Sequence, residues 1–193
     1  MKQAEIIKRY LNKFDELNVL FEKDKVVIEE LEDLLLDAYI EGFISNVFLF
    51  GEEVDMPKDY KDKVLNWAYE ETNKETGETY LESVSEKIRD YVENDKLADL
   101  KRLGDSELHR AYNVGAYDSA TEISNLTENT IKKTWVTMAD DKVRDTHAYL
   151  EGLTIGLDAE FVTYDGDSAL FPSGFKKAQN NANCRCILVY SNE

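Results

Sequence analysis

The chain has 193 residues and a mass of 22.2 kDa; 42% of its residues are hydrophobic and 33% are charged. This balance indicates a globular protein of one domain or two small ones and excludes collagenous, linker-rich and disordered classes. The longest apolar stretch, residues 43–50, is interrupted by Ser45 and Asn46, so nothing approaches the roughly 18 apolar residues of a membrane span. The N-terminal residues lead directly into an amphipathic pattern, so no signal peptide is expected.

The formal net charge of −17 is concentrated in the N-terminal two thirds of the chain. From residue 132 onward seven basic residues stand against nine acidic ones, whereas the segment before it holds sixteen against thirty-one. A field of this sign repels nucleic acid and anionic membranes and favours a basic protein partner. A solvated helix surface has the same composition, so both interpretations stay open.

Apolar residues recur at three- and four-residue steps through most of the first 130 positions, which is the helical period. The pattern predicts helices over residues 6–21, 26–48, 58–73 and 79–94, the third of them opened by Pro57. A short helical piece is predicted over residues 97–103, ended by Gly104. Another helix then starts at Asp105 and continues to about Ala120, with small residues on one side that predict close packing.

The period changes after residue 133, where β-branched and aromatic residues form runs of strand length. These runs predict strands over 134–138, 153–155, 160–164 and 186–190. Residues 140–150 are long enough for three helical turns, and Gly152 is placed to end them. The predicted fold class is α+β, with a mostly helical N-terminal region followed by a compact domain of helices and a small antiparallel β-sheet.

Within the predicted helix over 140–150, Asp140, Arg144 and His147 are spaced by four and three residues and would share one face. The simplest interpretation is an ion-paired helix that joins the sheet by its polar side. Further along, Asn183-Cys184-Arg185-Cys186 precedes the last predicted strand.

The order of these residues resembles the phage head morphogenesis domain, the family of the phage Mu F protein and related minor head proteins. The resemblance covers roughly residues 80–193 and divides the chain into a helical N-terminal arm, 1–77, and a Mu F-like head morphogenesis domain, 78–193. Glu107 falls in a segment similar to the family's Arg-Thr-Glu helix, with Asp105 and Ser106 replacing the arginine and threonine. The motif and structural residues that the resemblance singles out are Glu107, Trp135, Asp140, Arg144, His147, Gly152, Asn183, Cys184, Arg185 and Cys186.

The resemblance implies a non-catalytic minor capsid protein of a tailed phage or prophage. Such a protein lies in the virion, in the capsid interior or at the portal vertex, and in the host bacterial cytoplasm during assembly. The implied partners are the portal protein and other capsid or scaffold proteins, and the implied role is head assembly or the packaging and delivery of DNA. No membrane association is expected. Direct DNA binding is expected to be weak, because Lys132, Lys133, Lys176 and Lys177 are the only clustered basic candidates.

We expect the helix over 140–150 and the last strand to be joined by one cluster of Asp140, Arg144, His147, Asn183, Cys184 and Cys186. Arg185 would face away from the cysteines and could reach a carboxylate such as Glu107. Trp135 is expected in the core, and His109 at the surface or its boundary.

The two cysteines allow three states. Some relatives carry cysteines at the positions of Arg144 and His147, which beside Cys-x-Cys would surround a zinc ion with four thiolates. Here His147, Cys184 and Cys186, with Asp140 as a fourth candidate, would still suit a structural zinc ion in ligand type. Two reduced thiols are the alternative, and a disulfide is disfavoured because so short a link strains its geometry.

An enzyme is the alternative from another class, a toxin-like hydrolase or nuclease using His147 with Cys184 or Cys186 and with Asp140 as the orienting acid. The sequence offers these residue types without any supporting motif. It contains no glycine-rich phosphate loop, HExxH motif or zinc deaminase signature.

Overall fold

The structure, a computed structural model, describes residues 24–52, 54–65, 80–94, 96–127 and 129–192. Its helices are α2 (Asp24–Phe50), α3 (Tyr60–Leu65), α5 (Tyr80–Glu93) and α6 (Leu97–Thr127), followed by a β-rich module with two further one-turn helices. The predicted α+β class is confirmed. The helix predicted over 6–21 and the second half of that over 58–73 lie outside the described residues.

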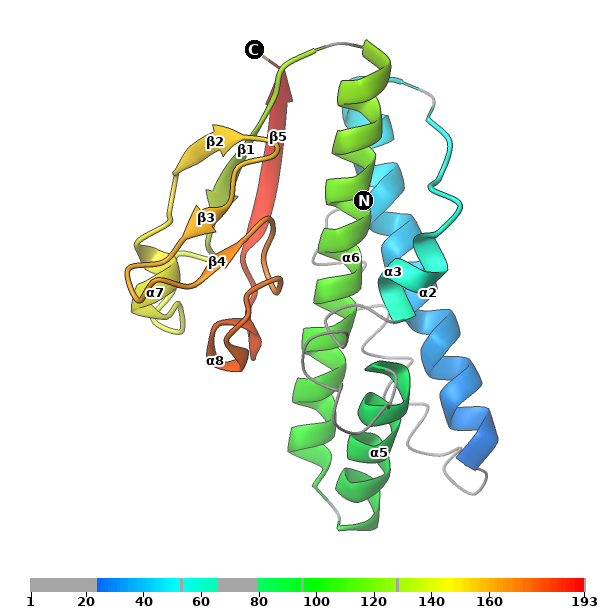
Figure 1. Cartoon of the computed structure of the whole chain (residues 1–193). Helices are drawn as coiled ribbons and strands as arrows, with labels where there is room; N and C mark the ends of the chain where they lie inside the picture. Colours follow the sequence, from blue (N-terminus) through cyan, green and yellow to red (C-terminus); the bar gives the residue numbers. More distant parts are fainter. Residues whose placement is uncertain (1–23, 53, 66–79, 95, 128, 193) are drawn as a thin grey trace.

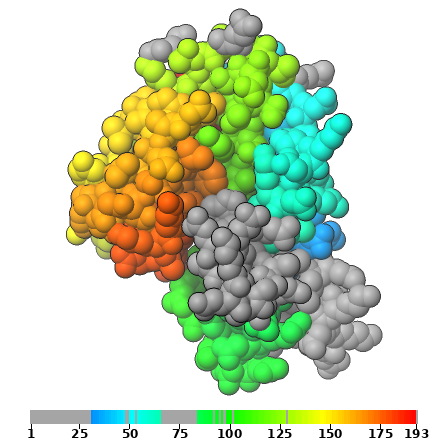
Figure 2. Space-filling model, in the orientation of Figure 1, coloured from blue at the N-terminus to red at the C-terminus, as the bar shows by residue number. Residues whose placement is uncertain are grey.

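Helix α6 forms the centre of the molecule, with the β-rich module on one side and α2 and α3 on the other (Figure 1). The space-filling view shows that module as a lobe, coloured yellow to red, beside the helices (Figure 2). Among the described helices, none combines the length and the apolar character that crossing a membrane requires.

The main helical contact is between α2 and α6, which run side by side in the same direction (Figure 1). Gly42 and Gly115 lie where the two helices touch. A Cβ on Gly42 would come within 2.0 Å of the Tyr112 carbonyl oxygen, and one on Gly115 within 2.0 Å of the Tyr39 carbonyl oxygen. The close packing predicted from small residues on α6 is therefore a backbone-to-backbone contact that only glycine permits.

Apolar side chains at helical spacing fill the rest of this interface, and buried polar groups fix its alignment. The Tyr39 hydroxyl donates to the Asp118 carboxylate at 2.8 Å, and the Asn46 amide donates to the Ala116 carbonyl. Lys63 of α3 reaches the same Asp118 at 3.1 Å. The buried apolar residues on α2 and α6 include Leu31, Leu35, Phe43, Leu108, Ala111, Ala120 and Ile123.

The prediction that Gly104 ends a helix is wrong, because α6 continues unbroken from Leu97 to Thr127. A glycine inside a helix costs about 1 kcal/mol relative to alanine. Burial of Leu100 and Leu108 on either side of Gly104 supplies more than that, since full burial of one leucine contributes about 1.5 to 3 kcal/mol.

Two small antiparallel sheets form the β-rich module. The first has the order β2-β1-β5, with β1 (Ile131–Val136) between β2 (Thr154–Gly156) and β5 (Ile187–Asn192). Its register pairs Trp135 with Leu188 across β1 and β5. The second is a hairpin of β3 (Phe161–Val162) and β4 (Ser168–Ala169), and the short β4 was not predicted.

Burial alternates along β1, so that Ile131, Lys133 and Trp135 all point inward. Ile131 belongs to the core that the helices share, whereas Trp135 belongs to a second core. This second core lies inside the β-rich module and consists of Trp135, Leu150, Phe161, Ala169, Phe175, Cys184 and Cys186. It is the setting of the candidate site.

The predicted three-turn helix over 140–150 is also wrong, because only α7 (Asp145–Ala148) is helical. The Asp140 carboxylate accepts a hydrogen bond from the Lys142 N–H at 3.1 Å, and the Asp140 carbonyl accepts one from Val143. An aspartate that binds the backbone two residues on stabilises a turn in place of a helix. Gly152 ends the segment as predicted, with φ at +72°, and its N–H donates to the Trp135 carbonyl at 2.9 Å.

Candidate functional site

His147 lies at the centre of the second core, on α7, with 1% of its surface exposed. Its ring packs edge-on against Trp135 at 5.4 Å and in a tilted arrangement, at an interplanar angle of 32°, against Phe175 at 5.3 Å, both measured between ring centroids. Its Nδ1 faces both cysteine sulfurs, at 3.4 Å from Cys186 and 3.7 Å from Cys184. The short α7 turn thus holds one imidazole nitrogen against two thiols from a segment 37 or more residues later.

The two cysteines are buried and not joined in a disulfide. They flank Arg185, whose side chain is exposed, so the Cys-x-Cys segment alternates between inside and outside just before β5. A hydrogen bond from Cys186 lowers the pKa of the Cys184 thiol. The same contact with Cys184, reinforced by burial, raises the pKa of Cys186. The two thiols therefore form a hydrogen-bonded pair, in which Cys184 loses its proton more readily than Cys186.

His109 joins the same site from α6, although the sequence predicted it at the surface or its boundary. It is 3% exposed, and its Nε2 lies 2.7 Å from the Cys186 carbonyl oxygen. The sequence did carry a signal for this position. His109 precedes Tyr112, Ala116 and Ala120 at steps of three, four and four residues, so it lies on the buried side of the helix.

Charged side chains cover the site on its solvent side. Arg185 binds the Asp140 carboxylate through two hydrogen bonds of 2.7 Å, which lower the pKa of Asp140. The Arg144 guanidinium donates to the carbonyl oxygens of Gln179 and Ala182. A small pocket opens between these groups and the buried core, lined by Met138, Lys142, Val143, Arg144, His147, Asn183, Cys184, Arg185 and Cys186.

The structure brings the residues of the predicted cluster together, but Asp140 and Arg185 have other hydrogen-bond partners than predicted. Asp140 is bound to Arg185 and not to His147, and it does not share a helix with Arg144. Arg185 does not reach Glu107, which pairs with Arg110 of its own helix at 3.2 Å. Burial raises the pKa of Glu107 against the pull of that arginine.

Asn183 lies at the pocket rim with φ at +55°, a left-handed conformation that asparagine tolerates better than most residues. Its N–H donates to the Ser106 hydroxyl of α6 at 3.3 Å. Trp135, predicted in the core, is fully buried. The Asn-Cys-Arg-Cys segment is therefore held by α6 on one side and by α7 on the other.

The structure places two of the four lysines considered for DNA binding in different surroundings. Lys133 is fully buried, and its ammonium donates to the Leu170 carbonyl at 2.8 Å and lies 4.9 Å from the centre of the Tyr117 ring. Burial lowers the pKa of Lys133 to about 8. Lys177 is bound to Asp165 at 3.1 Å. Lys133 is thus engaged inside the protein, and Lys177 forms an ion pair at the surface.

Residues 63–189 match the model of the family described as Phage Mu protein F like protein. The chain belongs to this family. The resemblance stated from the motif residues is therefore confirmed, and the matched region of this Mu F-like protein begins earlier than residue 80. It contains α6, the β-rich module up to the middle of β5, and every residue of the site, whereas α2 lies before it.

Two curated relatives are similar to this Mu F-like chain. It is 32% identical over 158 residues to the NAD(+)--arginine ADP-ribosyltransferase EFV of Enterococcus faecalis, a match that takes in 80% of the chain. It is 29% identical over 94 residues, 49% of the chain, to the minor head protein GP7 of Bacillus phage SPP1. The Mu F-like chain spans 30% of the length of each of these relatives. No solved structure is significantly similar to it.

Proposed function

We propose that the protein is a non-catalytic minor head protein of a tailed phage or prophage, bound to the portal and the procapsid interior during head assembly and DNA packaging or delivery. The observation that carries the proposal is the family match over residues 63–189, together with the similarity to a phage minor head protein. Its residence is the virion, and the host cytoplasm during assembly.

The geometry of the site favours a structural role over catalysis. A nucleophilic cysteine needs a base that is oriented by a third group. Here His147 Nε2 is buried without a hydrogen-bond partner among the described residues, and Asp140 is occupied by Arg185. Both cysteines are 4% exposed. A hydrolase or nuclease would therefore find the required residue types here, but no carboxylate that orients His147 as a base.

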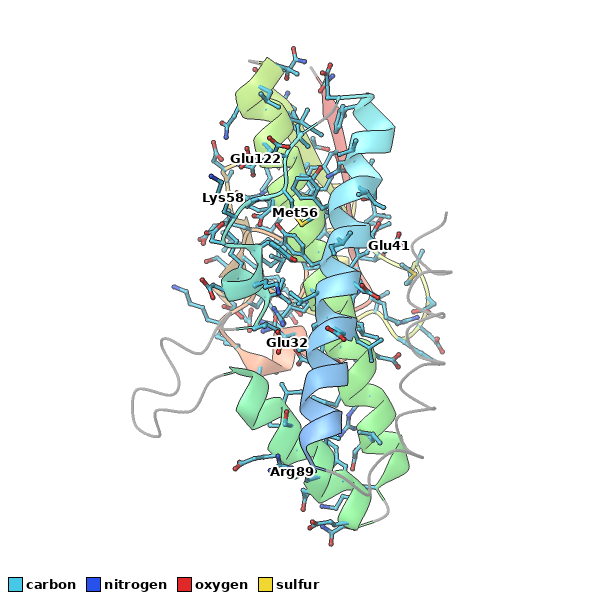
Figure 3. All side chains as sticks on the ribbon, turned by 90° about the vertical axis from the view of Figure 1, so that its right-hand side faces the viewer. Glu32, Glu41, Met56, Lys58, Arg89 and Glu122 are labelled. Atoms are coloured by element: carbon cyan, nitrogen blue, oxygen red, sulfur yellow. The ribbon has the colours of Figure 1, made fainter. Side chains whose placement is uncertain are left out.

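The outer side of α2 supplies a docking surface of suitable charge for a basic partner. Glu32 and Glu41 lie on the side of α2 that faces the viewer in Figure 3, with α6 behind it, and Asp33 is exposed nearby. The chain's net charge of −17 adds long-range attraction for a basic surface. On this proposal the arm, residues 1–77, makes the contact with the portal or scaffold, and the Mu F-like domain, 78–193, has a structural role.

Co-expression with the portal, scaffold and major capsid proteins of the same phage tests the proposal. The protein should sediment with procapsids on a gradient and be lost from procapsids that are assembled without the portal. The double variant Glu32→Lys with Glu41→Lys should reduce its incorporation, whereas Asp141→Lys, an exposed acid of the β-rich module, should not. Failure of the wild-type protein to sediment with portal-containing procapsids would overturn the proposal.

The similarity to an ADP-ribosyltransferase calls for a direct test of catalysis. Incubation of the purified protein with NAD⁺ and an arginine-containing acceptor should give no transfer of ADP-ribose. Turnover above a heat-inactivated control would contradict the non-catalytic assignment.

A further inference from the structure

Both histidines and both cysteines of the chain lie in one site. The sequence contains two histidines and two cysteines, and His109, His147, Cys184 and Cys186 meet in the β-rich module although they span 77 positions. Imidazole and thiolate are the ligands that zinc and similar divalent ions prefer. All four residues are less than 5% exposed.

Three of these residues present their donor atoms to one point. His147, Cys184 and Cys186 each have a ligand atom within 4.8 Å of the other two, and all three residues are buried. Zinc bonds of about 2.3 Å to sulfur and about 2.05 Å to nitrogen place the two atoms about 3.6 Å apart in a tetrahedron. The observed separations from Nδ1 to the sulfurs, 3.4 and 3.7 Å, lie on either side of this value.

Hydrogen bonding alone serves this arrangement poorly. The Nδ1 atom of an imidazole offers either one hydrogen or one lone pair, yet two sulfurs face it at similar distances. Nδ1 can therefore hydrogen-bond to one of the two sulfurs at a time, and the other sulfur has its thiol neighbour as a partner. A metal ion at the same point would bind all three atoms at once.

We propose that His147 Nδ1 and the sulfurs of Cys184 and Cys186 bind one divalent metal ion of the zinc type. Binding replaces the two thiol hydrogens, which leave as protons to solvent, and forms one metal–nitrogen and two metal–sulfur bonds without any change of oxidation state. The ion and two thiolates have a net charge of zero. A neutral group can be held in this apolar core, whereas an uncompensated charge would be expelled.

The fourth coordination position faces the pocket beside the three ligands. That pocket holds about one water molecule, which supplies an oxygen ligand from the solvent side. Asp140, considered as the fourth ligand from the sequence, is instead bound to Arg185 through both of its oxygens. The site is thus a three-residue site completed by water.

His109 acts as a positioning residue for this site. Its Nε2 holds the Cys186 carbonyl at 2.7 Å and so ties the ligand-bearing segment to α6. In this role the imidazole acts as a hydrogen-bond donor to the Cys186 carbonyl, and it also forms a hydrogen bond with the Cys184 thiol. His109→Gln retains such a donor and is the matched control for loss of a ligand histidine.

Cobalt titration of the untagged, reduced protein tests the proposal. Cobalt(II) should bind at one equivalent per chain and give a thiolate-to-cobalt charge-transfer band with the visible bands of a tetrahedral ion. Zinc should displace cobalt and so remove both the charge-transfer band and the visible bands. Elemental analysis of the zinc-loaded protein should give one zinc per chain. His109→Gln should keep the charge-transfer band, whereas His147→Gln and Cys186→Ser should weaken cobalt binding at least tenfold.

Circular dichroism ensures that each variant compared is folded. If a variant fails to fold, the cobalt titration of the wild-type protein still tests the proposal. A folded, reduced wild-type protein that gives no charge-transfer band with cobalt overturns it. An unchanged cobalt spectrum in folded Cys186→Ser overturns it as well. Chelator should lower the melting temperature of the zinc-loaded wild type and leave that of Cys186→Ser unchanged, and the absence of any such difference would also count against the site.

Discussion

His147 illustrates how a single side chain can be placed by the residues around it more than by its own element. Its helix is one turn long, and the ring is fixed by Trp135, Phe175 and the two sulfurs. The sequence predicted that His147 and the cysteines would be neighbours through family resemblance, and the structure places them so. Spacing alone could not do this, because the contact joins residues 37 and 39 positions apart.

Replacing His147 or Cys186 by alanine should lower the free energy of unfolding by about 1 to 3 kcal/mol, the range for buried packed or hydrogen-bonded side chains. Urea unfolding of protein kept in chelator measures the effect without any contribution from metal. Met138→Ala is the control, because Met138 lines the same pocket but is 45% exposed and should change stability by less than about 0.5 kcal/mol. Unchanged unfolding of both site variants would contradict the packing described for this core.

Lys133 gives the protein a pH dependence of known sign. Burial lowers its pKa in the folded state from 10.5 to about 8, so between these values the unfolded chain binds more protons than the folded one. Stability contributed by Lys133 therefore rises as pH increases from about 8 to about 10.5.

The variant Lys133→Met isolates this effect, because methionine fills the cavity without titrating. The difference in unfolding free energy between wild type and Lys133→Met should change in favour of the wild type as the pH rises through that window. A difference that is constant from pH 7 to pH 10.5 would show that the ammonium is not desolvated.

At the scale of elements, the apolar period located the long helices, although it divided α6 wrongly at Gly104, and it did not locate the short helices after residue 139. The three- and four-residue period located α2 and α5 closely, because burial of an apolar stripe is a local and repeated signal. The same reasoning predicted a helix after Asp140 that does not form. The hydrogen bond between the Asp140 carboxylate and the Lys142 N–H stabilises a turn there, in a segment with few apolar contacts to stabilise a helix. Strand β4 has two residues and exists only through its pairing with β3.

The crossing of α2 and α6 should be intolerant of a single methyl group. Gly115→Ala places a Cβ 2.0 Å from the Tyr39 carbonyl oxygen, so the helices must separate, at a cost of about 1 to 3 kcal/mol or more. Gly156→Ala is the matched control, because a Cβ there meets nothing within 4 Å. Denaturant unfolding of the two variants compares them, and equal stability would refute the close contact.

At the scale of the whole molecule, the helical arm and the Mu F-like domain share one core. The family match begins at residue 63, yet α2, which precedes it, contributes Leu31, Leu35 and Phe43 to the core around α6. The sequence predicted a boundary at residues 77 and 78, and that boundary stays a prediction. What the sequence could not reveal is the surface to which α2 binds, since amphipathic helices of similar period have interchangeable partners.

The segment 63–193 expressed alone should therefore be poorly folded, because removal of α2 exposes the apolar side of α6. Circular dichroism and sedimentation should show reduced helicity and self-association relative to the full chain. A monomeric segment with the melting temperature of the full chain would contradict the shared core.

The pairing of β1 with β5 has a consequence for the order in which the protein is built. Trp135 and Leu188 are register partners separated by about fifty residues of turns and short elements. On the ribosome, β1 emerges long before β5, while α2 and α6 are already free to dock. The second core, which contains Trp135, is therefore completed only when Cys184 and Cys186 have been synthesised, and a nascent chain stalled before them would expose part of that core to chaperones.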